Sequence, residues 1–415
     1  MSGRTRGSRA VSLIIPTLLL IAVSGCATAT ARRSAHGAPA DVLCGTDVLK
    51  RDNFKQLQGL RIAVVTNQTG RDREGNRLVD LLAAAKNVKL VKILAAEHGL
   101  YGNLDEKITD TVDPKTKLPV LSIYGKTRKP TTQMVSDVDA IVYDMRDVGA
   151  RFYTVSATLG LCMEAAAEHH LKMFVLDRPN PITGTIVDGP IADKDKLNFV
   201  AYAQIPVAHG MTMGELARYY NGELKIRCDL TVIPCEHWQR DMWWDETNLP
   251  WTKSSPNMRN TTAALLYTGI CLLEQTNTSV GRGTDQPFEF FGAPWIDARK
   301  LSSALNALNL PGVRFVPIDF TPTTSKFKTE PCHGCYVIVT NRNKIQPVQM
   351  GIAIVCQLHQ LFGNNFQLEG VNKLLKNDKT MAAIKSARDW QTIPQSWQQD
   401  LTEFKKRRAK YLLYK

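Results

Sequence analysis

Polar and charged side chains follow short apolar runs in this sequence, at points where buried strands would end. These positions hold Asn67, then Glu97 and His98, then Asp144, Arg146 and Asp147, and finally Asp177, Arg178 and Asn180. Carboxylic acids, imidazoles and guanidinium groups together can transfer protons and bind anions. Glu97 is the best placed acid, because a largely apolar run precedes it and a glycine-rich turn follows it. The residues therefore favour acid–base chemistry.

Familiar cofactor and metal motifs are missing from the sequence. The turn after the first apolar run, Thr66 to Gly70, has no G-x-G-x-x-G pattern, and the glycine-rich stretch at Gly281 to Thr284 lacks a Walker lysine. Neither a G-x-S-x-G elbow nor an H-E-x-x-H helix is present, and the pair Cys332-x-x-Cys335 has no second ligand pair near it. We therefore expect no cofactor and no metal, and catalysis by carboxylates.

The elements that must position these groups alternate between strands and helices. Strands are predicted at residues 61–66, 88–96, 118–124, 140–144 and 172–177, and helices at 77–86, 154–170 and from 261 onward. Such alternation predicts an α/β fold with a Rossmann-like, doubly wound parallel sheet. Since the carboxyl ends of parallel strands line the ligand crevice, the polar strand ends are expected to meet at one site.

The length suffices for about two domains with cores of their own. Loop-forming residues concentrate around 250–260. We predict a signal peptide at 1–25, a tether at 26–43, the Rossmann-like catalytic domain at 44–255, and a smaller α+β auxiliary domain at 256–415.

The N-terminus is typical of an exported lipoprotein. Arg4, Arg6 and Arg9 precede an apolar run from residue 11 to 23, which is too short to span a bilayer as a mature helix. The run ends in Ser24-Gly25-Cys26, which resembles the bacterial lipobox, so Cys26 is predicted to carry the lipid anchor. Ala27 follows where an aspartate would favour inner-membrane retention. We therefore expect a cell-envelope protein in the periplasm, anchored to the outer membrane.

Charge and cysteine usage bear on partners and compartment. The net charge of +13 falls to about +10 without the signal-peptide arginines, which suits an anionic partner. An exported protein rarely meets nucleic acid, so a carboxylate-bearing envelope polymer such as peptidoglycan is the expected partner. Eight cysteines remain beside Cys26, and Cys228 with Cys235 and Cys332 with Cys335 are the near-neighbour disulfide candidates.

Several longer motifs resemble those of the bacterial exo-β-N-acetylmuramidases. They are Asn67 to Gly70, Ala96 to Gly102, Tyr143 to Tyr153, Asp177 to Pro181, Val207 to Thr212, Glu274-x-x-Asn277, Ser279 to Thr284, and Phe288-Glu289. The resemblance runs from about Gly59 to the end of the chain. It implies a Rossmann-like domain with a C-terminal companion that releases N-acetylmuramic acid from the non-reducing end of peptidoglycan fragments.

The resemblance and the residues agree on Glu97 as the general acid. Glycoside cleavage needs a carboxylic acid that protonates the leaving oxygen. The second catalytic group stays open: Asp144 or Asp147 could activate water, or the 2-acetamido group of the substrate could act as nucleophile. Asp144 is the first candidate among the protein groups.

Selection of muramic acid calls for a cation that binds its lactyl carboxylate, and a guanidinium suits a carboxylate better than an ammonium. The candidates are Arg146, Arg151, Arg178 and Arg282. Further substrate-binding candidates from the motifs are Asn67, His98, Tyr153, Asn180, His209, Asn277 and Glu289, with Tyr153 offering an apolar face to a sugar ring.

Two rival functions stay open on the sequence alone. A non-catalytic envelope lipoprotein that binds muropeptides would need the arginines but not Glu97. An esterase or amidase would need a nucleophile motif that the sequence lacks. The oligomeric state is unknown at this stage.

Overall fold

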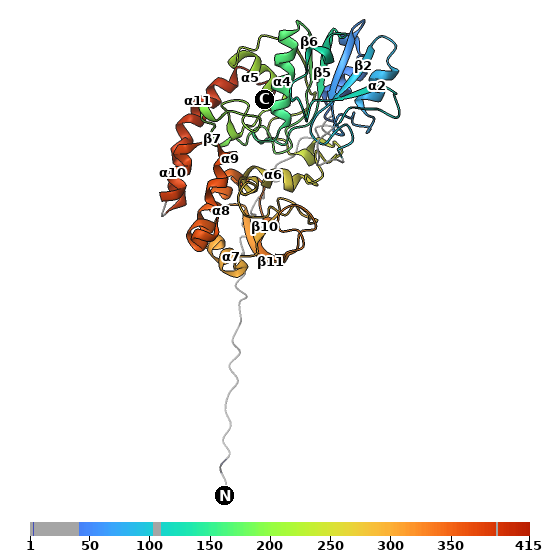
Figure 1. The fold of residues 1–415 in the computed structure, drawn as a ribbon. Coiled ribbons are helices and arrows are strands. Elements are labelled where there is room, and N and C mark those ends of the chain that lie inside the picture. The colour runs from blue at the N-terminus through green and yellow to red at the C-terminus, as the bar shows by residue number, and fades with distance from the viewer. Residues whose placement is uncertain (1–2, 4–40, 103–108, 387–388) are drawn as a thin grey trace. The chain divides into compact units, whose positions relative to one another are not determined.

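Seven strands form the central sheet of the computed structural model, which describes residues 3, 41–102, 109–386 and 389–415. The strands are β1 (Arg61–Thr66), β2 (Lys89–Ala95), β3 (Thr111–Val112), β4 (Pro119–Ser122), β5 (Ala140–Asp144), β6 (Lys172–Leu176) and β9 (Asp229–Ile233). Their order is β3-β4-β2-β1-β5-β6-β9, and all neighbours are parallel except the short β3 against β4. Strands β2, β5 and β6 of this sheet are labelled in Figure 1. The chain moves outward from β1 in one direction and then returns to β5 and moves outward in the other, which is doubly wound topology.

Strand residues alternate between two hydrophobic clusters, one on each face of the sheet. On β1, Ile62 and Val64 face the cluster covered by α1 (Gly45–Arg51) and α2 (Leu78–Ala84). Ala63 and Val65 face the other cluster, which includes α4 (Val155–Glu168) and α5 (Met213–Glu223). Because side chains of a strand point alternately to the two faces, a strand buried on both sides must be apolar throughout.

All five predicted strands and the three predicted helices are confirmed. β1 and β5 have the predicted bounds, and the other elements differ by at most a few residues at their ends. The first half also contains α3 (Thr132–Val135) and the antiparallel pair β7 (Asp188–Ile191) and β8 (Pro206–Ala208).

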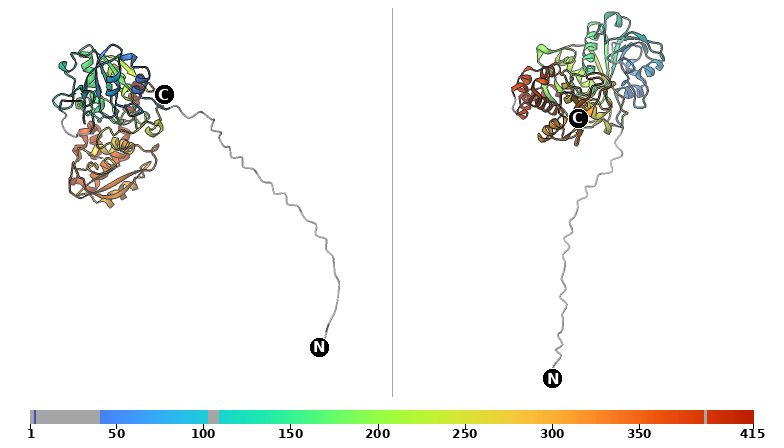
Figure 2. Two further views of the ribbon diagram at one scale, coloured as in Figure 1. Left: turned by 90° about the vertical axis from the view of Figure 1, so that its right-hand side faces the viewer. Right: turned by 60° about the horizontal axis from the view of Figure 1, so that its bottom comes forward.

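The C-terminal half combines helices with a small antiparallel sheet, so the predicted α/β fold with a smaller α+β companion is confirmed. Its strands are β10 (Phe290–Ala293), β11 (Val313–Phe320) and β12 (Cys332–Val339), with β12 in the middle. Its helices are α6 (Thr261–Ile270), α7 (Ala298–Ala307), α8 (Pro347–Phe362), α9 (Asn372–Leu375), α10 (Asp378–Ser386) and α11 (Gln398–Ala409). The two halves are visible one above the other in the left view of Figure 2.

Helix α6 is held by a close backbone contact with α8. A Cβ added to Gly269 would lie 2.0 Å from the carbonyl oxygen of Pro347, so only glycine permits this approach. The contact fixes the helix that carries Tyr267 into the site described below.

The two halves share one continuous core. Residues from Ala63 on β1 to Phe404 on α11 belong to the same buried cluster. Helix α11 lies beside α5 and β7 (Figure 1), and Arg408 donates hydrogen bonds to the carbonyl oxygens of His209 and Gly210. The predicted domain boundary at residue 255 is therefore not marked by a break in the core, and it stays a prediction.

The predicted signal peptide and Cys26 lie outside the described residues. Within the described ranges, no helix is both long and apolar enough to cross a membrane.

Candidate active site

A cavity of about 780 Å³ lies where the carboxyl edge of the sheet meets the C-terminal half. Its polar and aromatic lining from the first half includes Glu97, His98, Tyr124, Arg128, Tyr153 and Thr154. The C-terminal half contributes Tyr267, Glu274, Arg282 and Phe288. Glu97 follows β2, Tyr124 follows β4, and Thr154 lies between β5 and α4, so the predicted meeting of strand ends is found for these elements.

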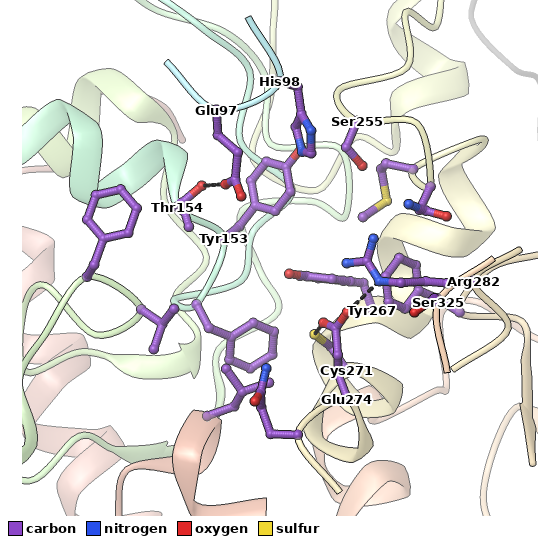
Figure 3. A pocket seen from close by; sticks show the side chains of 18 of the residues that line it. Glu97, His98, Tyr153, Thr154, Ser255, Tyr267, Cys271, Glu274, Arg282 and Ser325 are labelled. Atoms are coloured by element: carbon purple, nitrogen blue, oxygen red, sulfur yellow. Dashed lines mark hydrogen bonds and ion pairs between the residues drawn. The ribbon is translucent and has the colours of Figure 1, made fainter. Parts of the chain in front are cut away.

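Two hydroxyl groups hold the carboxylate of Glu97. The Tyr124 hydroxyl donates to Oε1 over 2.6 Å, and the Thr154 hydroxyl donates to Oε2. Figure 3 shows Glu97 pointing into the pocket with Thr154 on one side. Burial and the neighbouring Glu97 carboxylate raise the pKa of Tyr124, so this phenol remains a donor at neutral pH. The carboxyl group therefore has a fixed orientation toward the cavity.

His98 lines the pocket from a left-handed backbone conformation, with φ of 67°, and Gly99 follows with φ of 73°. Non-glycine residues adopt this conformation rarely, and histidine is one of the types in which it is more frequent. The tight turn leads the chain away immediately after Glu97, which leaves both side chains at the cavity (Figure 3).

Aromatic rings form a wall between Glu97 and the opposite side of the pocket. Tyr267 makes edge contacts with Phe152, Tyr153 and Phe288, with ring centroids 5.4, 5.8 and 4.8 Å away. Burial raises the pKa of both tyrosines, so they are neutral. Such rings offer apolar faces to the C–H groups of a sugar.

Glu274 and Arg282 form an ion pair at another part of the lining. The Cys271 thiol donates to Glu274 Oε2 over 3.1 Å, and the Arg282 guanidinium lies 5.2 Å from the centre of the Phe288 ring. The Glu274 carboxylate raises the pKa of Arg282, although burial opposes this effect. In Figure 3 the rings of Tyr153 and Tyr267 lie between this pair and Glu97.

Arg128 is an exposed cation on the pocket lining. Its guanidinium lies 4.1 Å from the ring centre of Phe199 and 5.9 Å from that of Tyr124, the tyrosine that holds Glu97. The residues that the structure describes give Arg128 no carboxylate partner. A cation stacked on rings and facing a cavity is suited to bind an anionic substituent.

Family comparisons agree with this architecture along nearly the whole folded chain. Residues 62–262 match the family described as exo-beta-N-acetylmuramidase NamZ, N-terminal, and residues 265–414 match its C-terminal counterpart. The chain belongs to the exo-β-N-acetylmuramidase family. The resemblance inferred from the motifs is thereby confirmed.

Individual relatives extend over the same residues. The peptidoglycan beta-N-acetylmuramidase NamZ of Bacillus subtilis strain 168 is 40% identical over 378 residues, which cover 90% of this chain and 91% of that protein. Two crystal structures of DUF1343 family proteins from Bacteroides fragilis have the same fold. One has a TM-score of 0.84 at 35% identity, covering 90% of this chain and 99% of that one. The other has a TM-score of 0.73 at 32% identity, covering 91% and 99%.

The structure brings four of the predicted site residues of this family member to the pocket: Glu97, His98, Tyr153 and Arg282. Asn67 and Glu97 both line a small second cavity, but Asn67 Oδ1 accepts hydrogen bonds from the Thr69 amide and hydroxyl, at 2.9 and 2.6 Å. Asn67 therefore shapes the turn after β1.

Asp144 lies away from the pocket, buried in an ion pair with Arg178. The Thr46 hydroxyl also donates to Asp144 Oδ2 over 2.8 Å, and Arg178 donates to the carbonyl of Arg71 over 2.8 Å. Neither side chain is accessible to a sugar. Their position argues against the predicted catalytic role of Asp144 and the predicted substrate contact of Arg178, because the charge of each group is already balanced by the other.

Two further predicted arginines are also committed to the protein interior. Arg146 lies over the rings of Trp251 and Trp244, and its pKa is lowered to about 9 by burial. Arg151 donates to the carbonyl oxygens of Pro190, Ile205, Leu374 and Leu375, which joins the two halves of the chain. Burial lowers its pKa to about 9 as well. Neither lines the pocket, so Arg282 is the predicted arginine that does.

The remaining predicted residues make internal contacts. Asn180 donates to the Met211 carbonyl over 3.1 Å, and His209 contacts Asp147 at 3.1 Å in full burial. Asn277 binds backbone atoms of residues 365 and 367, and Glu289 accepts from Asn260 over 2.8 Å. These contacts stabilise loops around the site, and the side chains do not line the cavity.

The near-neighbour disulfide predictions are wrong for this structure, in which the eight cysteines from Cys44 to Cys356 are free and buried. Cys332 and Cys335 lie three residues apart on β12 and so point to opposite faces. Cys228 and Cys235 flank the whole of β9 and lie at its two ends. In the described part of the chain, no cluster of three or more His, Cys, Asp or Glu side chains is arranged to hold a metal ion.

Sequence reasoning missed Tyr124, Thr154, Tyr267 and Arg128. Tyr124 ends a predicted strand, so it could have been found by the rule that identified Glu97, which is that polar residues at the carboxyl ends of parallel strands line the ligand crevice. Thr154 begins a predicted helix, where a threonine is read as a cap. Tyr267 lies within an apolar helix and Arg128 within a loop, and neither position carries a local signal.

Proposed function

We propose that the protein is an exo-acting glycoside hydrolase that releases N-acetylmuramic acid from the non-reducing end of peptidoglycan fragments, with Glu97 as its general acid. The observation that supports this most directly is the Glu97 carboxyl group, which two hydroxyls orient into a cavity lined by aromatic rings. Family membership supports the reaction class.

Glu97 is the group proposed to protonate the leaving oxygen. Tyr124 and Thr154 each donate to one carboxyl oxygen of Glu97, so they fix the plane of the group at the cavity. Positioning of this kind lowers the entropic part of the barrier. The aromatic wall around Tyr267 binds the sugar ring and excludes water from the reacting centre.

Glu274 is the second glutamate on the pocket lining. Its ion pair with Arg282 fixes its orientation, which suits a group that hydrogen-bonds the substrate or directs its 2-acetamido group. The anomeric configuration of the first product, followed by NMR, reports whether the reaction retains or inverts.

Arg128 is proposed to bind the lactyl carboxylate, the group that distinguishes muramic acid from glucosamine. Arg282 is already paired with Glu274, whereas Arg128 contacts only rings among the described residues. Since Tyr124 touches both Arg128 and Glu97, a carboxylate bound at Arg128 would hold the sugar beside the acid.

We further propose that the protein is a periplasmic lipoprotein tethered to the outer membrane through Cys26. The support comes from the N-terminal sequence alone: three arginines, an apolar run and the Ser24-Gly25-Cys26 motif.

The deciding experiment measures release of free N-acetylmuramic acid from a chromogenic muramide and from a muramic acid–glucosamine disaccharide. Release from both, together with failure on the matching glucosaminide, is expected. Binding of the disaccharide without release would instead establish a non-catalytic muropeptide-binding protein. Cleavage of an ester or peptide bond in a muropeptide, with the sugar intact, would establish an esterase or amidase.

A further inference from the structure

Two cysteines that are far apart in the sequence lie on two paired segments, one at the start of the folded chain and the other just after β9. Leu43 and Glu236 form an isolated antiparallel bridge, in which the Leu43 amide donates to the Glu236 carbonyl over 3.1 Å and the Glu236 amide donates to the Leu43 carbonyl over 2.9 Å. One step along this pairing brings Cys44 opposite Cys235. Cys44 has an extended backbone, with φ of −74° and ψ of 165°.

The register makes Cys44 and Cys235 a non-hydrogen-bonded pair. The Cys44 amide donates to Asp47 Oδ2 and the Cys235 amide donates to the Tyr414 hydroxyl, each over 2.8 Å, so neither bonds across the pair. Opposite residues in such a pair point to the same face, with Cα atoms roughly 4.5 Å apart. A disulfide accepts Cα separations of about 4.4 to 6.8 Å.

A second contact shows that the two segments approach as closely as backbones can. A Cβ added to Gly45 would lie 2.5 Å from the Ile233 carbonyl oxygen and 2.5 Å from the Asp177 amide nitrogen. The Gly45 amide also donates to the Asp177 carbonyl over 2.8 Å. Residues 44–45 are therefore fixed against the end of β9, and the pairing of the cysteines does not depend on a loose terminus.

The two thiols contact each other in a buried setting. They belong to a small cluster with Trp238, Trp244 and Leu249, and their exposed fractions are 2% for Cys44 and 5% for Cys235. Burial and the hydrogen bond with Cys44 raise the pKa of the Cys235 thiol. Such a thiol is slow to react in the folded protein, so oxidation is expected during folding or transient opening.

We propose that Cys44 and Cys235 form a structural disulfide when the chain folds in an oxidising compartment. The oxidant is a small or protein disulfide. One cysteine thiolate attacks it and releases one thiol, and the second thiolate then attacks the mixed disulfide and releases the other. The two cysteines lose two electrons and two protons, and the oxidant disulfide becomes two thiols. In the cell this step rests on the export proposed above, whereas with purified protein it does not.

The bond would fasten the point where the proposed tether meets the fold. Tyr414 lies in the same place, since its ring packs against Trp238 at 4.9 Å and its hydroxyl donates to Asp177 over 2.5 Å. The disulfide would thus secure the first folded residues beside the C-terminal tail and would close a loop that spans about half of the chain. Closure of a long loop destabilises the unfolded state.

Peptide mapping of the full chain tests the proposal directly. The protein is refolded with oxidised and reduced glutathione, denatured in an alkylating reagent without reductant, and digested. We expect one cross-linked peptide pair that joins Cys44 to Cys235, with alkylation of Cys162, Cys228, Cys271, Cys332, Cys335 and Cys356. Alkylation of both Cys44 and Cys235, separate glutathione adducts on each, or a different cross-link would overturn the proposal.

Thermal unfolding of variants provides a second measurement. Reduction should lower the melting temperature of the oxidised wild type by about 3 to 6 °C. Cys235→Ala should abolish this difference between oxidised and reduced samples, whereas the buried control Cys332→Ala should keep it. A folded Cys235→Ala whose melting temperature still falls on reduction would refute the pairing. If Cys235→Ala fails to fold, the peptide map of the wild type decides whether Cys44 and Cys235 are bonded.

Discussion

The substitution Glu97→Gln tests the proposed acid most sharply. The glutamine side chain keeps the length and planarity of the glutamate but has no proton to transfer. Its amide oxygen can still accept from the Tyr124 hydroxyl, which in the wild type donates to Glu97 over 2.6 Å. Its amide nitrogen would face Thr154, whose hydroxyl can rotate and accept instead of donating. The side chain should therefore remain in place.

The magnitude of each effect follows from these two hydrogen bonds. The glutamine can keep both hydrogen bonds, and each such bond is worth only about 1 kcal/mol in folding stability, so the protein should remain folded. Loss of general acid catalysis should lower the rate on the natural disaccharide by about 10² to 10⁴. That loss corresponds to roughly 3 to 5 kcal/mol in the activation barrier.

Two substrates with different leaving groups separate proton donation from positioning. An aryl muramide with an acidic leaving group needs little protonation, so Glu97→Gln should reduce its kcat/KM much less than that of the disaccharide. Tyr124→Phe removes one positioning hydroxyl and leaves the acid, so it should reduce both substrates by a similar, smaller factor. The melting temperature of each variant serves as the folding control.

Equal losses on the two substrates, or no loss, would refute Glu97 as the acid. In that case Glu97 would act by orienting neighbouring groups, and the assay would be repeated on Glu274→Gln. A differential loss for Glu274→Gln alone would transfer the role to the second glutamate of the pocket.

Four further predictions address other parts of the molecule. Arg128→Ala should weaken binding of free N-acetylmuramic acid by about 10- to 100-fold in calorimetry, with N-acetylglucosamine unaffected and Arg128→Lys intermediate; equal weakening of both sugars would contradict a carboxylate contact. Cys26→Ser should move the protein from the membrane fraction to the soluble fraction, and unchanged fractionation would exclude the lipid anchor. Arg151→Met should lower the free energy of unfolding, measured by urea denaturation, by at least about 3 kcal/mol, because four buried carbonyl oxygens lose their donor. The control Arg61→Met, at an exposed ion pair, should lower it by less than about 1 kcal/mol. Burial raises the pKa of Asp177 to about 6 from 3.8, so protonation of this group stabilises the folded state, and the stabilisation is lost as pH rises through 6. The free energy of unfolding of the wild type, measured relative to Asp177→Asn, should therefore be about 2 kcal/mol greater at pH 4.5 than at pH 7. The same difference between the two proteins at both pH values would refute the shift.

Five strands of the central sheet could be predicted from sequence because each depends on a local pattern, whereas β3, β9 and the order of the strands in the sheet were not predicted. A strand covered by helices on both faces must be apolar along its length, so β1 and β5 were delimited by their composition alone. The same rule identified Glu97, since a charged residue directly after such a strand lies at the carboxyl edge of the sheet. Motifs spread along the chain were sufficient to identify the family, which the comparisons confirmed.

The role of each arginine could not be predicted in this way. Arg151 and Arg282 are the same residue type within similar motifs, yet one donates to four buried carbonyls and the other lines the pocket. A long side chain can reach in several directions, and its partners come from distant segments such as residues 374–375. Only the tertiary packing decides whether a guanidinium satisfies the backbone or faces a ligand.

By itself, the sequence determined the α/β class, five strands and three helices with their approximate bounds, the placement of Glu97 at a strand end, and the family. Tertiary structure alone decided that Tyr124 and Thr154 hold Glu97, that Tyr267 from α6 completes the pocket, and that Cys44 faces Cys235. The physical reason is the range of the interactions involved. Strand burial and turn formation depend on neighbours within a few residues, whereas these contacts join segments whose approach is fixed only when the whole core has packed.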